Sequence, residues 1–281
     1  MKQNDLNFKK IFGLNFGDAA SSYHYKRVFG HFGVKERIND FFIRKLNDKY
    51  IPWGASWCRP WPVDYRSREP FRGVNFFMLR SNHVGFCPYW LPESYLVKHD
   101  IKRKKGEKGT PAILKNDNSL YIEQFFNIDQ LESFNMPVID NKPIKPAIEE
   151  IEDMILNFFG HLKGHDEFKY TIDDFKGQDP DYYYYLLFQY CCYNWYCETY
   201  KKELSFKPDQ HNKETLIYQL GACLLASYCR ISTPFYKGNG YDRNLWKMIL
   251  MSDENVIFDA TGVALIMYDA FLEAVEMQKA S

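Results

Sequence analysis

Aromatic and arginine side chains alternate between residues 53 and 72, in a segment that is also rich in Pro and Gly. The aromatic members are Trp53, Trp57, Trp61, Tyr65 and Phe71, and the arginines are Arg59, Arg66, Arg68 and Arg72. Aromatic faces stack on unpaired bases, while guanidinium groups hold phosphates or stack as well. This composition predicts a loop that binds single-stranded nucleic acid. The alternative is that the tryptophans fill a small core.

A second cluster of positive charge follows between residues 102 and 109. Its members are Lys102, Arg103, Lys104, Lys105 and Lys108. Gly106 and Gly109 would let backbone N–H groups approach a phosphate closely. No basic recognition helix of the kind that reads duplex DNA is evident, and interleaved aromatics favour single strands. The run could also be a solvated turn.

Charge and composition limit the possible classes of protein. Residues 1–135 hold 22 Lys+Arg and 14 Asp+Glu, and the rest hold the reverse, so the two halves carry +8 and −8. This split predicts two units, of which the first attracts a polyanion. The high apolar content excludes disorder. No apolar run is long enough to span a membrane and no signal-peptide pattern is present, so we expect a cytoplasmic protein with no membrane partner.

The residues of the second half offer little chemistry. The stretch YYYYLLFQYCCYNWYC at residues 182–197 carries three thiols, but the seven cysteines form no CxxC pair, and we expect buried, reduced thiols. His161 and His165 have i,i+4 spacing, although Gly164 marks a helix end and no Glu stands between them. No P-loop, G-x-G-x-x-G or G-x-S-x-G motif is present.

Periodicity and turn residues predict an α+β protein. Apolar spacing predicts a helix in residues 34–50, and short helices are expected at residues 74–82 and from residue 92. Residues 110–115 and 119–128 have strand character with Asn116, Asp117 and Asn118 between them, which predicts a β-hairpin. We expect an irregular extension at 1–33, a DNA-binding α/β domain at 34–140, a linker at 141–146 and a mostly helical domain at 147–281.

Five motifs in the first half resemble the N-terminal domain of the ArdC antirestriction family. They are the P-W…P-W loop from Pro52, F-R-G-V-N at 71–75, W-L-P at 90–92, K-G-E-K-G-T-P at 105–111 and F-N-I-D-Q at 126–130. The resemblance implies a single-stranded DNA-binding domain of a mobile element, and it adds Asn75 to the DNA-binding residues. Pro92 stands where the family has a Thr helix cap.

The same resemblance implies a zincin-like metallopeptidase domain in the second half, with an H-E-x-x-H helix and a later Glu as zinc ligands. When that pattern is laid over this chain, its positions fall on Gln189, Tyr190 and Tyr193, and on Gln219 for the third ligand. Every zinc-binding side chain is absent. We therefore expect a degenerate domain with no catalytic residue, no metal and no cofactor.

The sequence thus predicts a DNA-binding protein that protects incoming DNA, with single-stranded DNA as its partner and duplex DNA as a second one. The helical domain would brace the first domain or contact a protein. Two other classes stay open. One is a metallopeptidase with an unorthodox site at His161, His165 and a carboxylate, and the other is an inhibitor that binds a host defence enzyme.

Overall fold

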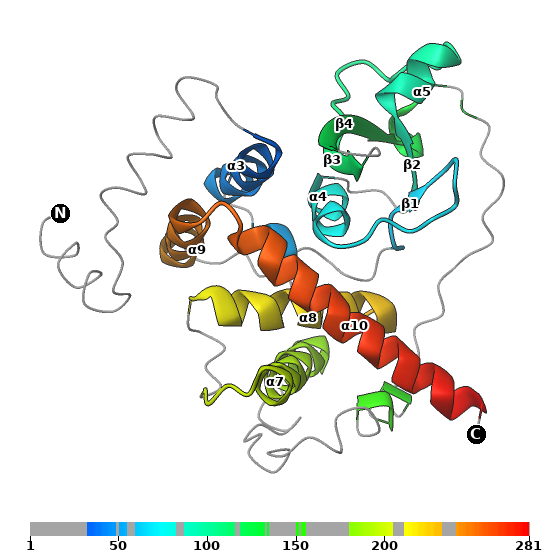
Figure 1. Ribbon diagram of the computed structural model, residues 1–281. Coiled ribbons are helices and arrows are strands. Elements are labelled where there is room, and N and C mark those ends of the chain that lie inside the picture. Colours follow the sequence, from blue (N-terminus) through cyan, green and yellow to red (C-terminus); the bar gives the residue numbers. More distant parts are fainter. Residues whose placement is uncertain are drawn as a thin grey trace, which may run out of the picture.

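A computed structural model of the chain describes residues 33–48, 51–54, 60–82, 87–115, 119–132, 134, 150–151, 153–155, 180–204, 211–231 and 240–280. Figure 1 shows a small sheet with its own helices on one side of the molecule and a group of longer helices on the other. The α+β class expected from the sequence is confirmed.

The sheet has four strands in the order β1-β2-β4-β3. These are β1 (Val63–Asp64), β2 (Tyr89–Pro92), β3 (Thr110–Lys115) and β4 (Leu120–Asn127). The predicted hairpin is confirmed, since β3 and β4 pair antiparallel with Ile113 opposite Ile122. β1 runs parallel to β2, and β2 pairs antiparallel with β4. β1 and β2 were not predicted, because segments this short carry almost no alternation.

The helices of the first half lie close to their predicted positions. They are α3 (Val34–Asn47), α4 (Val74–Asn82) and α5 (Glu93–Lys98), with short 3-10 turns η1 (Pro52–Gly54) and η2 (Ile128–Gln130). In α3, Ile38, Phe42 and Leu46 are buried as the apolar spacing predicted, whereas Phe41 stays half-exposed. Trp90, Leu91 and Pro92 belong to β2, and Pro92 also stands at the N-cap position of α5 without a side-chain cap.

Longer helices make up the second half. They are α7 (Pro180–Tyr200), α8 (Lys213–Cys229), α9 (Gly240–Ser252) and α10 (Val256–Ala280). α8 packs against both α7 and α10, and the long α10 crosses the molecule beside α4 (Figure 1). His161 and His165 lie outside the described residues. No described helix alone has the length and apolar character to cross a membrane, although the sharply bent pair α9 and α10 passes that test together.

One hydrophobic core joins the two halves. α3 packs on α9, where the Asn39 side chain donates a hydrogen bond to the Leu250 carbonyl. The Trp53 and Trp246 rings meet edge to face at 5.4 Å. Both the first helix of the predicted DNA-binding domain and η1 are therefore anchored on the second half. The predicted boundary at 141–146 lies outside the described residues and stays a prediction.

Candidate nucleic-acid interface

The predicted basic run is held in a fixed loop between α5 and β3, which we call the basic loop (residues 102–109). Its backbone is tied to the segment after β4. The Lys104 N–H donates to the Gln130 carbonyl at 2.9 Å, and the Glu132 N–H donates to the Lys102 carbonyl at 2.8 Å. These bonds fix the loop without using any lysine ammonium group.

The structure explains why both of these positions in the basic loop are glycine. Gly106 has φ +87°, a conformation that side chains with a Cβ rarely adopt. A Cβ at Gly109 would stand 2.9 Å from Cζ of Phe126, inside van der Waals contact. The spacing of the two glycines therefore reflects a turn and a close contact with β4.

Gln130 holds the loop from the other side. Asn127 and Gln130 form a reciprocal cap on η2, in which the Asn127 carboxamide accepts from the backbone of η2 and Gln130 Oε1 accepts from the Asn127 N–H. Gln130 Nε2 then donates to Glu107 Oε2 at 2.7 Å and to the Lys108 carbonyl at 3.1 Å. The motifs at 105–111 and 126–130 are thus two parts of one structural frame.

This frame leaves some of the loop cations available to a ligand. Arg103 pairs with Glu93 at 3.0 Å and lies over the Phe126 ring, and Lys104 Nζ donates to the Asp129 carbonyl. Lys102, Lys105 and Lys108 are exposed, and no described group pairs with their ammonium groups.

A cleft of about 690 Å³ separates α3 from the basic loop and the hairpin. Phe41, Arg37, Arg44 and Lys45 line it from α3, and Lys108 lines it from the loop. Pro111 and Ile122 contribute apolar surface from the strands. Half-exposed Phe41 provides an aromatic face with cations on both sides, which is the combination that single-strand binders use. Sequence reasoning missed the α3 residues, because helical spacing does not show what a polar face lies against.

Carboxylates in the cleft offset part of this charge. Arg44 is engaged by buried Asp40, and Glu107 is held by Gln130. Burial lowers the pKa of Lys45, and nearby Asp48 opposes that shift. The Arg37 guanidinium has no side-chain partner among the described residues. The charges best placed for a phosphate are therefore Arg37 on one wall, and Lys105 and Lys108 on or beside the other.

The aromatic residues of the predicted stacking loop are mostly packed inside the protein. Trp53 is 1% exposed and donates from Nε1 to Gln219 Oε1 at 3.0 Å. Trp61 lies between the rings of Phe76 (4.2 Å) and Tyr268 (5.2 Å). Phe71 is buried against Phe125. The packing of Trp53 and Phe71 agrees with the core alternative, whereas Trp61 is only partly buried and its stacking role stays a prediction.

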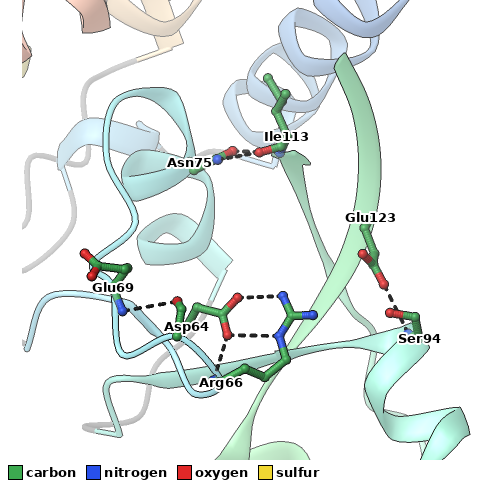
Figure 2. A network of polar contacts seen from close by, with 8 residues as sticks. Asp64, Arg66, Glu69, Asn75, Ser94, Ile113 and Glu123 are labelled. Carbon is green, nitrogen blue, oxygen red and sulfur yellow. Dashed lines mark hydrogen bonds and ion pairs between the residues drawn. The ribbon is translucent and has the colours of Figure 1, made fainter. Parts of the chain in front are cut away.

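The arginines of that loop are exposed but engaged. Arg66 makes a two-pronged pair with Asp64 (Figure 2). The Asp64 backbone N–H also donates to the Glu69 carbonyl. The Arg68 guanidinium lies over the rings of Tyr65 and Tyr89, and Arg72 pairs with Asp269 on α10. Their part in DNA binding stays a prediction. Trp57 and Arg59 lie outside the described residues.

Asn75 has a structural partner in place of a ligand. Its Nδ2 donates to the Ile113 carbonyl, and its Oδ1 accepts from the Ile113 N–H, both at 2.8 Å (Figure 2). The side chain thereby pairs with the free edge of β3 as a neighbouring strand would. With both polar atoms used, the carboxamide is not available to contact DNA in this conformation.

Two solved structures of the antirestriction protein ArdC from the R388 plasmid are similar to this chain. The metal-free structure gives a TM-score of 0.60 and the Mn(II)-bound structure gives 0.62. In both cases the sequences are 18% identical, and the match covers 86% of this chain and 98% of the ArdC chain. The chain has the ArdC fold. No family model and no curated protein matches it by sequence.

Because one of the ArdC structures holds Mn(II), we tested whether the predicted ligand positions of this chain suit a metal. Gln219 Oε1 accepts the Trp53 hydrogen bond, and the Tyr193 hydroxyl donates to the Leu204 carbonyl. Gln189 is buried, and its Oε1 has no hydrogen-bond partner in the part of the chain that the structure describes. One neutral carboxamide oxygen with two engaged neighbours does not fit a zinc site, which is built from carboxylate, imidazole or thiolate ligands, and it is a weak ligand set for other divalent ions.

Cysteines surround these positions but are unsuited to metal binding. Burial raises the pKa of the thiols of Cys191, Cys192 and Cys223, so they stay protonated at neutral pH. The Cys223 thiol donates to the Trp53 carbonyl at 2.9 Å. In the described part of the chain, no three His, Cys, Asp or Glu side chains converge as metal ligands would. The described histidine His211 is buried against Trp246.

Proposed function

We propose that this protein binds single-stranded DNA in the cleft between α3 and the basic loop. The observation that carries the proposal is a half-buried aromatic, Phe41, beside cations on both walls that have no partner among the described residues. A base stacked on Phe41 would contribute about 1–3 kcal/mol. Arg37, Lys105 and Lys108 would then hold the phosphates on either side of it.

Antirestriction is the role that we propose for this binding. The support is the shared fold with the R388 antirestriction protein, together with a basic loop built from the same motifs that the sequence resemblance identified. A protein that covers single-stranded DNA would keep incoming DNA from nucleases.

Substitutions on the two walls test the proposed site. We expect Lys108→Ala and Arg37→Ala each to weaken binding of a labelled oligothymidine several-fold at low salt, because each removes one phosphate contact. Fluorescence anisotropy is the suitable readout. Intrinsic tryptophan quenching is less suitable, because no described tryptophan lines this cleft. Lys202→Ala, an exposed cation beyond the end of α7, is the matched control and should leave binding unchanged.

Phe41 tests the stacking contribution separately. Phe41→Ala should weaken binding about tenfold, and Phe41→Tyr should restore it, because a phenol presents a similar face. Tyr200→Ala, which removes another partly exposed ring, should have no effect. If Phe41→Ala binds as the wild type does while both wall cations matter, the DNA follows the charges and does not stack in this cleft.

We infer in addition that the second half is a degenerate metallopeptidase domain. The inference rests on the poor fit of Gln189, Tyr193 and Gln219 to a metal ion. Elemental analysis of protein purified without chelators should find no stoichiometric zinc or manganese. A stoichiometric metal that withstands dialysis would contradict the inference. It would support the alternative of a metalloenzyme whose ligands lie outside these positions.

A further inference from the structure

A second cavity, distinct from the proposed DNA cleft, lies where the end of α8 meets α10. It has a volume of about 670 Å³, within the range of small-ligand sites. The segment after η1 closes one side with Trp61, Pro70 and Arg72. The other walls are Ser227, Tyr228, Arg230, Tyr268, Asp269, Leu272, Glu273 and Glu276.

Ser227 offers a polar group to a ligand in this cavity. Its side chain is 6% exposed, and its hydroxyl oxygen makes no hydrogen bond to any described residue. A buried hydroxyl without a partner costs about 1–3 kcal/mol, and most buried polar groups in proteins are paired. Because Ser227 lines the cavity, a ligand with a polar hydrogen can satisfy this oxygen.

The charges around the cavity indicate the sign of that ligand. Two guanidinium groups, Arg72 and Arg230, and three carboxylates, Asp269, Glu273 and Glu276, line the cavity, and Arg72 pairs with Asp269. Glu273 and Glu276 are exposed on the same face of α10, and in the described part of the chain neither has an ion-pair partner. Carboxylates therefore outnumber guanidinium groups in the lining, and the net charge of the cavity is negative.

The aromatic side chains that line the cavity also favour a positively charged ligand. Tyr228 and Tyr268 meet edge to face with ring centroids 6.3 Å apart. Burial raises the pKa of both phenols, which keeps them neutral. Neutral tyrosine faces attract cations through the ring quadrupole. An aromatic wall with carboxylates at its mouth suits a cationic group on an apolar stem.

We propose that this cavity binds an organic cation, an ammonium or guanidinium group carried on an alkyl chain. The cationic head lies between Glu273 and Glu276 and donates a hydrogen bond to the Ser227 oxygen. The alkyl stem packs on Tyr228, Tyr268 and Leu272. Such a group can come from a free amine or from a basic side chain of a partner protein. The site does not depend on DNA binding.

Titration calorimetry with agmatine, and with a capped Gly-Arg-Gly peptide, tests this proposal on the full chain. We expect agmatine to bind with a 1:1 stoichiometry and an affinity in the millimolar range or tighter. Binding of the peptide as well assigns the site to a protein side chain, and binding of agmatine alone assigns it to a free amine. If neither cation binds at millimolar concentration, the proposal is overturned.

Substitutions of the two glutamates test whether agmatine binds in this cavity. Glu276→Gln and Glu273→Gln should each weaken agmatine about three- to tenfold, since each removes one close charge at a partly exposed site. Glu203→Gln makes the same change of charge beyond the end of α7 and should bind agmatine as the wild type does. Equal weakening by Glu203→Gln would show a general effect of surface charge and would overturn the site. Thermal unfolding of each variant without ligand confirms that it is folded.

Discussion

At the scale of single residues, several side chains that looked suited to binding DNA are structural. Trp53 and Phe71 are buried, and the Asn75 carboxamide is used by the backbone of β3. Sequence alone could not show this, because an aromatic or amide side chain in a loop has the same appearance whether it faces a base or a strand edge. The lysines were easier to predict, since Lys side chains rarely become fully buried.

Asn75 gives a residue-scale prediction. Asn75→Ala removes both partners of the Ile113 backbone, so it should lower the free energy of unfolding by about 1–3 kcal/mol. Asn82→Ala removes one hydrogen bond, from exposed Asn82 to Thr110, and should cost less. Urea unfolding at neutral pH measures both. Equal costs for the two variants would contradict the role given to Asn75.

At the scale of helices and strands, hydrophobic periodicity predicted the longer elements, in which the apolar spacing repeats several times. The helical spacing in α3, the buried run of α4 and the alternation of β3 and β4 all produced the expected elements. The strands β1 and β2 were not predicted, because they are two and four residues long and pair with strands distant in the sequence. The cleft was not predictable either, because its two walls come from segments that are far apart in the sequence.

The start of α5 shows how one element compensates for an unfavourable residue. Pro92 occupies the N-cap position and makes no side-chain cap. The carboxylate of Glu123 on β4 instead accepts from the Ser94 N–H at 3.1 Å (Figure 2). The weak cap expected from the sequence is therefore replaced by a contact from across the sheet.

This compensation leads to an element-scale prediction. Glu123→Ala should lower the free energy of unfolding by about 0.5–2 kcal/mol, the usual cost of a lost cap. Adding Pro92→Thr should recover much of that loss, because a Thr hydroxyl can accept from the same turn, whereas Pro92→Thr alone should change little. A double-mutant cycle by urea unfolding measures the coupling. Fully additive effects would show that the two caps do not substitute for each other.

At the scale of the whole molecule, the sequence correctly predicted the α+β class and the contrast between a small sheet and a group of long helices. It gave no indication that α3 and Trp53 would join the core of the second half. Apolar spacing shows that a helix face is buried but not which partner covers it. The hydrophobic core of the described residues therefore contains side chains from both the positively and the negatively charged half of the chain. The prediction of two units was based on that difference in charge.

The buried thiols make the stability of this core depend on pH. Burial raises the pKa of four cysteines in α7 and α8, Cys191, Cys192, Cys223 and Cys229, the last to about 12. In the unfolded chain a thiol titrates near about 8.5, so the unfolded state loses its protons first. The contribution of these thiols is thus fully present below about pH 8.5 and is lost as pH rises toward the folded-state values.

We therefore expect the free energy of unfolding to fall between about pH 8.5 and pH 10, by up to about 1.4 kcal/mol per pH unit for each thiol. Urea unfolding in the presence of a reductant measures the slope. Cys229→Ala removes one of these thiols and should make the slope shallower. A free energy of unfolding that stays constant across this range would contradict the burial of the four thiols.

The most direct test of the central claim is a titration of labelled oligothymidine and of duplex DNA of equal length, at low and at moderate salt. The proposed cleft predicts tighter binding of the single strand, with a log–log salt slope of about −0.7 for each phosphate contacted. The Lys105→Ala, Lys108→Ala double variant should make that slope shallower by about 1.4. No binding of the single strand at low salt, or an unchanged slope in the variant, would contradict the assignment of this cleft to DNA.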